Sequence, residues 1–341
     1  MRLLVIGGTV FLGRHFVSLA LAAGHQVSTI NRGSHVLDEQ ESVERLIADR
    51  DGDLSLLHGR TFDAVIDTCA YHPESIRHSI NVLRQSVGTY LFVSTVSVYG
   101  AFSKIGICEE DPMQYTAPGA EGNYGSLKVD CEMIVSELMP ESALIIRPGL
   151  LAGPYDPTDR FTYWPARFAR GGKILVPGRL DRLIQFIDVR DLASWMLRLL
   201  DAQARGIYIA TGPNERLTMG AFLDACEEKV GSNDLELVRV EDAVLEAAGI
   251  EPWSELPLWI PASNSNFAGV MRLNRSKAAE AGLTCRPIAA TISDTFNWDI
   301  QRDPSVPRVA GLSAEREEKV LLQPKLTQNP GRGPLPGAGL R

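Results

Sequence analysis

A short stretch near the beginning of the chain decides the fold: Leu3-Leu4-Val5-Ile6-Gly7-Gly8-Thr9-Val10-Phe11-Leu12-Gly13. Its apolar run predicts a buried strand, and the amphipathic segment from Leu12 to Ala23 predicts a helix that stops at Gly24. The glycine turn between them presents backbone N–H groups and a helix dipole, which suit a pyrophosphate. The sequence therefore predicts a nucleotide site, with the binding residues Gly7, Thr9, Val10, Phe11, Leu12 and Gly13.

One position of this turn departs from the usual pattern. Val10 stands where a glycine commonly lets the backbone approach the phosphates closely. We expect this β-branched residue to change how the pyrophosphate lies and to lower the affinity for a nucleotide.

The first 150 residues alternate between short apolar runs and longer amphipathic segments, a pattern typical of βαβ units. The predicted strands are Arg2 to Ile6, Gln26 to Ile30, Arg45 to Ile47, Ala64 to Asp67, Tyr90 to Ser94 and Ala143 to Arg147. The predicted fold class is α/β, a Rossmann-type doubly wound parallel sheet with a smaller C-terminal α/β substrate-binding region. We expect a dinucleotide-binding domain over 1–150 and a substrate-binding region over 151–312, part of which returns to the sheet. A short helix and a disordered tail are expected over 313–341.

Composition excludes several classes of protein. The chain has 341 residues, 45% of them hydrophobic, and a net charge of −8, which indicates a globular protein without a cationic field for nucleic acid. Its five cysteines, and His72 and His78, show no metal-ligand spacing. No apolar run resembles a signal sequence or a membrane span. We expect reduced thiols, no metal site, no membrane partner and a cytoplasmic location.

The end of the second predicted strand bears on the choice of cofactor. It carries Asn31-Arg32-Gly33 and lacks the acidic residue that accepts hydrogen bonds from the adenosine ribose of NAD. A guanidinium suits a 2′-phosphate, so Arg32 favours NADP(H) over NAD(H), although a solvated loop arginine is the competing interpretation. Asp49, after the third strand, either contacts the adenine or closes the turn that follows it.

Two further segments indicate a catalytic site. Tyr124 and Lys128 are spaced i, i+4 and therefore lie on one face of a predicted helix. The apolar run from Leu91 ends in Ser94-Thr95, at the edge of the sheet where the carboxyl ends of parallel strands face a nucleotide. Thr95 and Tyr124 are therefore expected to converge.

With these residues the chain resembles the short-chain dehydrogenase/reductase superfamily, in its extended and atypical branch of NAD(P)-dependent epimerases and dehydratases. The resemblance rests on the turn Gly7 to Gly13, Asp67-Thr68-Cys69-Ala70, Ser94-Thr95, Val98-Tyr99-Gly100, Tyr124 with Lys128, Arg147-Pro148-Gly149 through Gly153-Pro154, and Phe186 to Ala193. It implies that Tyr124 is the general acid/base and that Thr95 hydrogen-bonds the reacting oxygen. It further implies that Lys128 binds the nicotinamide ribose and lowers the pKa of Tyr124, and that Thr68 and Ala70 line the cofactor site. A homodimer formed through the helix Tyr124 to Met139 and its neighbour is also implied.

The resemblance narrows the reaction. Val96-Ser97 stands where related sugar 4,6-dehydratases carry an Asp-Glu pair, so elimination lacks its acid and base. Reduction or epimerisation of a carbinol or carbonyl substrate, such as a nucleotide sugar, remains. The alternative is a non-catalytic NADP-binding or RNA-binding protein similar to the chloroplast stem-loop-binding proteins. The loop Arg160 to Arg167 is the nearest RNA-binding candidate, and a packed substrate-domain loop is its competing interpretation.

Substrate contacts are harder to assign, because a few loop residues decide them. The candidates are Arg147, Tyr155, Arg160, Tyr163, Gln185 and Arg190. Arg160 and Arg190 are suited to a diphosphate, although a surface salt bridge explains either residue equally well.

Overall fold

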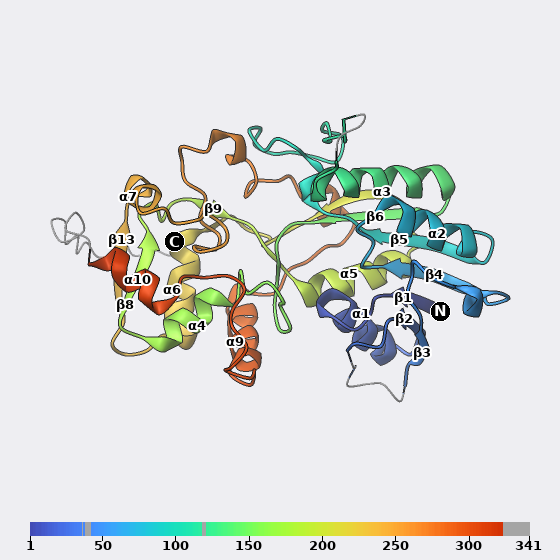
Figure 1. Cartoon of the computed structure of the whole chain (residues 1–341), viewed down its shortest axis with the longest axis horizontal. Helices are drawn as coiled ribbons and strands as arrows, with labels where there is room; N and C mark the ends of the chain where they lie inside the picture. The colour runs from blue at the N-terminus through green and yellow to red at the C-terminus, as the bar shows by residue number, and fades with distance from the viewer. Residues whose placement is uncertain (36, 38–41, 118–120, 323–341) are drawn as a thin grey trace.

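The computed structural model describes residues 1–35, 37, 42–117 and 121–322, which form two lobes side by side (Figure 1). The first lobe is built on a seven-stranded sheet in the order β11-β6-β5-β4-β1-β2-β3, and every pair of neighbours is parallel. Its strands are β1 (Arg2–Ile6), β2 (Gln26–Asn31), β3 (Glu44–Ile47), β4 (Phe62–Asp67), β5 (Val87–Val93), β6 (Ala143–Pro148) and β11 (Gly206–Ala210). The strand order reverses beside β1, as in a doubly wound fold, so the predicted fold class is confirmed.

Helices cover both faces of this sheet. They are α1 (Phe11–Ala22) and α5 (Val189–Asp201) on one face, and α2 (Pro73–Leu83) and α3 (Tyr124–Leu138) on the other. Because both faces are covered, the central strands are mainly apolar, and Leu3, Leu4 and Val5 are fully buried. The helix after the glycine turn begins at Phe11, one residue earlier than predicted.

The second lobe comes from the C-terminal half of the chain. Its strands are β7 (Leu151–Ala152), β8 (Lys173–Pro177), β9 (Leu183–Ile184), β10 (Ile187–Asp188), β12 (Leu217–Thr218) and β13 (Glu236–Val240). Its helices are α4 (Tyr163–Arg170), α6 (Met219–Val230), α7 (Asp242–Ala247), α9 (Ile288–Asp299) and α10 (Ala314–Leu321), while α8 (Ser276–Glu280) packs near β11. Short 3-10 helices lie at Ser55–Leu57, Val96–Val98 and Ser265–Phe267. A second hydrophobic core, which includes the aromatic residues Trp164 and Phe222, holds this lobe together.

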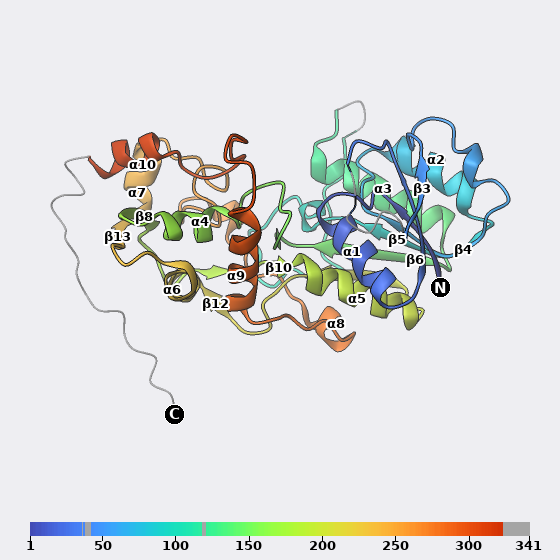
Figure 2. The same ribbon diagram turned by 90° about the horizontal axis from the view of Figure 1, so that it is seen from below.

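Helix α10 is an integral part of the second lobe. Glu317 is 2% exposed and accepts hydrogen bonds from Arg167 Nε at 2.8 Å and from the backbone N–H of Leu175 at 3.0 Å. Figure 2 shows the helix lying against the strands of this lobe. The disordered tail expected after this helix, over residues 323–341, lies outside the described residues.

The lobes are joined by segments that cross between them. The chain around residues 264–274 returns to the loop that follows β5, where the N–H of Phe102 donates to Asn266 at 2.9 Å and that of Asn274 donates to Ile107 at 2.9 Å. On the other side, Thr291 of α9 donates to Asp188, the N-cap of α5, at 2.8 Å. These contacts fix the width of the space between the lobes.

Candidate active site

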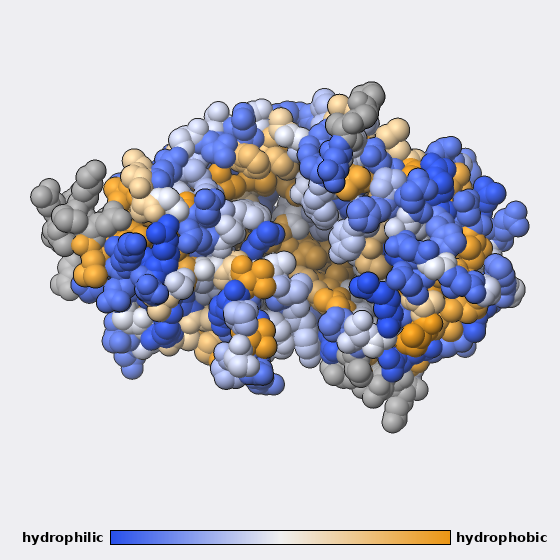
Figure 3. Space-filling view, in the orientation of Figure 1, coloured by the Kyte–Doolittle hydropathy of each residue, from blue (hydrophilic) through white to orange (hydrophobic). Residues whose placement is uncertain are grey.

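A cavity of about 1140 Å³ lies between the lobes, at the carboxyl ends of the strands. The space-filling view shows the hollow on one face of the molecule, with apolar residues inside it (Figure 3). All the glycine-turn residues predicted to bind a nucleotide line one end, and Tyr124 and Arg160 line the other. The position agrees with the rule that ligands of open α/β sheets bind at this edge.

The glycine turn is shaped to let another group approach its backbone. Gly7 and Gly8 have φ values of 101° and 80°, which disfavour other residues. A Cβ atom on Gly13 would lie 2.7 Å from the backbone of Gly8, so α1 packs directly on the turn. Val10 is accommodated because its φ is −124°, an ordinary extended value, and its side chain is 46% exposed. The residue of this turn with an unfavourable backbone conformation is instead Phe11, whose φ is 38°.

The end of β2 offers unpaired donors to the same cavity. Asn31 Oδ1 accepts from the N–H of Gly33 at 2.9 Å, while its Nδ2 is buried without a partner. Arg32 lines the cavity, is exposed, and has no hydrogen-bond or ion-pair partner within the part of the chain that the structure describes. Asp49 also lines the cavity and accepts from the N–H of Asp51 at 3.1 Å, which closes the turn after β3.

A buried ionic network lies beneath this end of the cavity. Arg50 donates two hydrogen bonds to Asp67, at 2.7 and 2.8 Å, and Tyr90 donates a third at 2.8 Å. Burial would raise the pKa of Asp67, but the Arg50 guanidinium holds that pKa below its usual range. The carboxylate therefore stays ionised beside Thr68, which lines the cavity and whose side chain occupies the space that a Cβ on Gly7 would need.

Lys128 is held by the sheet. Its side chain is 2% exposed, and Nζ donates to the carbonyl oxygens of Ala70 at 2.9 Å and Val93 at 2.7 Å, over the ring of Phe92. Burial lowers the pKa of Lys128 to about 8, and the charge of Asp67 limits the decrease. Ala70, predicted to line the cofactor site, is fully buried and is not among the residues that line the cavity; its carbonyl group accepts from Lys128.

Tyr124 stands at the N-terminus of α3 with its side chain 51% exposed in the cavity. Asn123 caps this helix by accepting from the N–H of Ser126 at 3.1 Å, which fixes where the helix begins. Burial of the phenol raises the pKa of Tyr124, and a hydrogen bond with Thr95 and the charge of Arg160 oppose the rise. The resemblance implies a pKa lowered by Lys128; here burial outweighs the opposing causes and the pKa of Tyr124 is raised, and the effect of Lys128 on it stays a prediction.

Thr95 and Ser94 complete this part of the site. Thr95 Oγ1 accepts from the N–H of Ser97 at 3.1 Å, so the residue caps the 3-10 helix that follows β5 and its hydroxyl is held in place. The hydroxyl of Ser94 is buried without a partner. The predicted convergence of Thr95 and Tyr124 is therefore present in the structure.

Two of the six predicted substrate residues line the cavity. Arg160 does so with a guanidinium that lies 5.8 Å from the ring centroid of Trp253. Gln185 also lines it, but its amide exchanges hydrogen bonds with the backbone of Leu273, at 2.8 and 3.2 Å. Gln185 thus anchors the segment that returns over the cavity.

The other four candidates point elsewhere. Arg147 is 1% exposed and binds Glu132, at 2.6 Å, and the hydroxyl of Tyr99, so its charge is used to fix α3 against β6. Removing one member of such a buried pair costs about 3–5 kcal/mol. The substrate contact expected of Arg147 is therefore a misassignment, because a buried, fully paired guanidinium has no donor left for a ligand.

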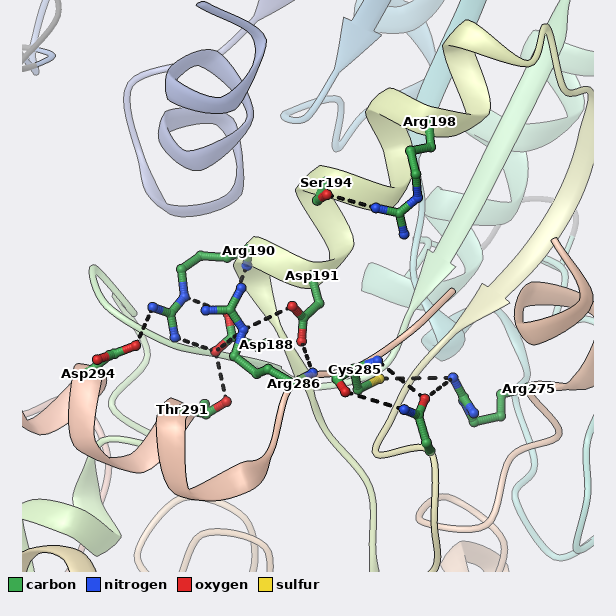
Figure 4. Close-up of polar contacts among 11 residues, drawn as sticks. Asp188, Arg190, Asp191, Ser194, Arg198, Arg275, Cys285, Arg286, Thr291 and Asp294 are labelled. Carbon is green, nitrogen blue, oxygen red and sulfur yellow. Dashed lines mark hydrogen bonds and ion pairs between the residues drawn. The ribbon is translucent and has the colours of Figure 1, made fainter. Parts of the chain in front are cut away.

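Tyr155, Tyr163 and Arg190 are likewise absent from the cavity wall. The Tyr155 ring packs on Arg14, His15 and Trp298, and Tyr163 is 3% exposed in the aromatic core. Arg190 donates to Asp188 at 2.7 Å and to Asp294 at 2.6 Å (Figure 4). It ties α5 to α9, and the predicted substrate role is not supported for these three residues.

The loop considered for RNA binding is a packed segment. Phe161, Trp164 and Arg167 are all buried, and Arg167 is paired with Glu317. The inward packing of the aromatics expected by the competing interpretation is present, although the segment from Tyr163 onward is helix α4 and not a loop. Across the described ranges the structure shows no cluster of potential metal ligands, and no helix there has the length and apolarity to cross a membrane.

The residues that line the cavity on the side of the second lobe were not predicted from the sequence. Trp253, Phe267, Met271 and Leu273 line it from the C-terminal half, and Thr211 adds a buried hydroxyl without a partner. No motif marks these residues, because their place depends on how the chain returns between the lobes.

A family model describes the same architecture. The model for the NAD dependent epimerase/dehydratase family matches residues 3–210, well over half of the chain. The chain belongs to this family. The match confirms the resemblance to the extended short-chain dehydrogenases/reductases and the expectation of an enzyme of this type, in a family described as NAD-dependent.

Individual relatives agree in fold. The UDP-Glc/GlcNAc 4-epimerase of Campylobacter jejuni superposes with a TM-score of 0.67 at 17% identity, over 88% of this chain and 99% of that one. The UDP-glucuronic acid 4-epimerase of Bacillus cereus, solved in complex with NAD, gives 0.64 at 15% identity, over 88% and 99%. The chloroplast stem-loop binding protein of 41 kDa b from Arabidopsis thaliana is 26% identical over 257 residues. That alignment covers 70% of this chain and 65% of the relative, so the chain spans less than two thirds of the relative's length.

The geometry of the cavity, considered apart from the related proteins, also fits a dinucleotide. Gly7, Gly8 and Gly13 line the cavity with their backbone, and the Asn31 Nδ2 group and the Ser94 hydroxyl lack partners although they are buried. Buried polar groups are almost always hydrogen-bonded, so unpaired ones beside a cavity indicate a ligand. The residues suited to hold the cofactor are therefore those of the turn, the end of β2 and the Lys128 region.

Proposed function

We propose that the protein is an epimerase or reductase that acts at a carbinol or carbonyl carbon of a nucleotide sugar. The observation that carries this proposal is the placement of Tyr124. Tyr124 is half-exposed and lines the cavity together with Thr95, Lys128 and a glycine turn suited to a dinucleotide. A positioned acid/base beside a nicotinamide site is the arrangement that oxidation of a carbinol requires, because the hydroxyl must lose a proton as the carbon loses a hydride.

The roles of the side chains follow from their positions. When bound, the nicotinamide supplies hydride transfer. Tyr124 moves the proton at the substrate oxygen, and Thr95, held by the N–H of Ser97, orients that oxygen. Lys128, directed by two carbonyl groups, is positioned to hold the nicotinamide ribose. Ser94 offers a second hydroxyl on the same wall.

Redox or epimerisation chemistry is favoured over elimination. The 3-10 helix after Thr95 carries Val96 and Ser97, neither of which is an acid. Asp156 lines the cavity, but its carboxylate accepts hydrogen bonds from the N–H and hydroxyl of Thr158, both at 2.8 Å, and so shapes its own loop. Among the described residues, the wall beside Thr95 thus lacks the paired acid and base that the resemblance assigns to a dehydratase.

The cofactor preference that we propose is NADP(H). Arg32 is exposed in the cavity wall at the end of β2 and, among the described residues, has no partner for its charge. A guanidinium binds a phosphate in a bidentate manner. The Bacillus cereus epimerase was solved with NAD, but it is only 15% identical to this chain, so its cofactor does not decide the preference here.

Two measurements test the proposed reaction. Incubation of the protein with a panel of nucleotide sugars and either cofactor, followed by NMR of the products, should reveal an epimer or an oxidised or reduced sugar. Native mass spectrometry of the purified protein then separates the mechanisms, because a retained dinucleotide indicates an epimerase and an empty site indicates an exchanging reductase. If no member of the panel is converted and no dinucleotide binds, the proposal is wrong.

Binding of structured RNA is the second candidate, because the Arabidopsis relative is a stem-loop binding protein. The net charge of −8 and the buried aromatics of the 160–167 loop argue against it. Fluorescence anisotropy with a labelled stem-loop distinguishes the two functions. Binding that survives Tyr124→Phe and excess dinucleotide would favour the RNA-binding function.

The homodimer and the cytoplasmic location stay predictions. In the helix proposed to form the interface, Ile134 and Val135 are buried in the core of the chain itself, and Met133 is exposed. The outer face of the α2 and α3 pair carries an ion pair between Arg77 and Glu137 at 3.9 Å. Light scattering at micromolar concentration tests the dimer, and a monomer would contradict it.

A further inference from the structure

We propose that Gln114 is a positioning residue that sets the placement of Thr95 relative to Tyr124. Gln114 lies between the 3-10 helix Val96–Val98 and α3, and its side chain contacts the residues at both ends. The inference rests on the proposed function, because it concerns the two side chains assigned to the reacting oxygen. Gln114 itself does not line the cavity, so it acts through other residues.

The first contact of Gln114 is with the segment that carries Thr95. Its Nε2 donates to the carbonyl oxygen of Ser97 at 2.6 Å, and its backbone N–H donates to the carbonyl oxygen of Val98 at 2.8 Å. The N–H of Ser97 in turn donates to Thr95 Oγ1 at 3.1 Å. Ser97 therefore binds Gln114 through its carbonyl group and holds the Thr95 hydroxyl through its N–H.

The second contact of Gln114 is with the start of α3. Asn123, the N-cap of this helix, donates from Nδ2 to Gln114 Oε1 at 3.3 Å. The Oδ1 of Asn123 accepts from the N–H of Ser126 at 3.1 Å. Tyr124 directly follows Asn123 and is the first residue of α3. Gln114 is therefore bound to the cap that fixes where the helix of Tyr124 begins.

Backbone groups at the two ends fix the orientation of both amides. The carbonyl oxygen of Ser97 can only accept a hydrogen bond, so it requires the Nε2 of Gln114 and directs Oε1 to Asn123. The N–H of Ser126 can only donate, so it requires the Oδ1 of Asn123 and directs Nδ2 to Gln114. The middle hydrogen bond thus joins a donor to an acceptor. An unbroken chain of hydrogen bonds runs from Thr95 to the first turn of α3.

Close packing surrounds the Gln114 amide. A Cβ atom on Gly125 would overlap Gln114 Nε2 and the carbonyl oxygen of Ser97, so the first turn of α3 packs directly against both groups. A Cβ atom on Gly100 would lie 2.6 Å from the Cβ of Gln114. The amide therefore lies between the backbone of Ser97 and the backbone next to Tyr124. Its removal is expected to change the spacing of these two segments.

The first test observes the Tyr124 hydroxyl in the protein without cofactor or substrate. Tyrosine labelled at the ring carbon that bears the hydroxyl is incorporated, and Tyr124→Phe identifies the Tyr124 NMR signal among the 8 tyrosines. Gln114→Met removes both side-chain hydrogen bonds, and Asn123→Ser keeps a capping oxygen but loses the amide donor. Thr95→Val is the reference, and near-ultraviolet circular dichroism checks that each variant is folded.

Thr116→Val is the matched control for this test. Thr116 belongs to the same segment as Gln114, and its hydroxyl donates to Asp130 of α3 at 3.2 Å. The substitution therefore also removes a hydrogen bond between this segment and α3. It leaves the chain of hydrogen bonds from Thr95 to Asn123 intact.

We expect Gln114→Met and Asn123→Ser to shift the Tyr124 signal in the same direction as Thr95→Val. In the Thr95→Val background, Gln114→Met should add no further shift, because both changes act on one contact. Thr116→Val should leave the signal at its wild-type position.

The inference is overturned by an unchanged Tyr124 signal in Gln114→Met, by full additivity with Thr95→Val, or by an equal shift in Thr116→Val. Gln114→Glu provides the same readout if Gln114→Met does not fold, because a carboxylate cannot donate to the carbonyl oxygen of Ser97.

The second test separates positioning from a purely structural role, on a substrate identified from the nucleotide-sugar panel. Gln114→Met should lower kcat by about tenfold and leave KM and the dinucleotide affinity within about twofold, because only the reacting groups are displaced. An unchanged kcat, or a rise in KM alone, contradicts the inference. The NMR test needs no turnover. A panel without any substrate therefore contradicts the proposed function only, and an unchanged Tyr124 signal contradicts this inference only.

Discussion

The two ends of the cavity are built in different ways. The cofactor end consists of segments that directly follow β1, β2, β4 and β5, so each contributes from the same edge of one sheet. The substrate end combines Tyr124 from the first lobe with Arg160, Trp253 and Met271 from the second. The cofactor end is formed by the strand ends of a single sheet, whereas the substrate end forms only where the two lobes meet.

This difference gives each end its own sensitivity to mutation. Changes in the glycine turn should affect the binding of the dinucleotide, and changes in the contacts that hold the second lobe should affect the substrate. The following predictions test that separation.

The largest effect is expected for Gly13→Val. A Cβ at this position would lie 2.7 Å from Gly8 Cα and N, so α1 would have to move away from the turn. We expect the affinity for the dinucleotide to fall by about a hundredfold, measured by fluorescence titration. Gly52→Ala is the matched control, since its nearest contact is an ordinary 3.5 Å. Equal affinities for the two variants would contradict the role of close packing in the turn.

The next effect concerns the substrate end. Asp159→Ala removes the buried carboxylate that binds Arg302, Arg308 and the N–H of Val309, and so releases the loop of Arg160. The value of kcat/KM should fall by about ten- to a hundredfold, because loss of positioning costs this much. The affinity for the cofactor should be unchanged. A loss of cofactor affinity equal to the loss of kcat/KM would show that the two ends are not separate.

Site residues that lie close together in the sequence were predictable, whereas contacts between residues far apart in the sequence were not. The glycine turn, Thr95 and the Tyr124 and Lys128 pair each lie within a few residues and obey the geometry of strand ends and helix faces. The pairing of Arg147 with Glu132, 15 residues away, and that of Arg190 with Asp294, 104 residues away, depend on tertiary contacts. A single sequence does not distinguish such arginines from Arg160, which has no carboxylate partner among the residues that the structure describes.

A smaller effect is expected at the end of β2. Arg32→Ala should lower the affinity for NADP by about tenfold, the value of one good charge-assisted contact, and leave NAD binding unchanged. Titration of both cofactors against the wild type and the variant measures the ratio. Unchanged discrimination would mean that Arg32 is a solvated loop residue.

The smallest effect is a pH dependence of cofactor binding. Burial lowers the pKa of Lys128 to about 8, so the side chain is cationic below this pH and becomes neutral as the pH rises through it. Affinity for the dinucleotide should therefore be highest below pH 8 and fall a few-fold above it. Lys128→Met should bind more weakly and show a flat profile. An unchanged pH dependence in Lys128→Met would assign the titration to another group.

The central claim is that Tyr124 performs chemistry at the junction of the two ends. The direct measurement compares Tyr124→Phe with the wild type on a substrate identified from the nucleotide-sugar panel. The substitution removes one oxygen from a half-exposed side chain, so folding and cofactor affinity should be kept. Turnover should fall by about 10² to 10⁴, the usual loss for a positioned acid/base. Turnover by Tyr124→Phe at the wild-type rate would contradict the proposed mechanism.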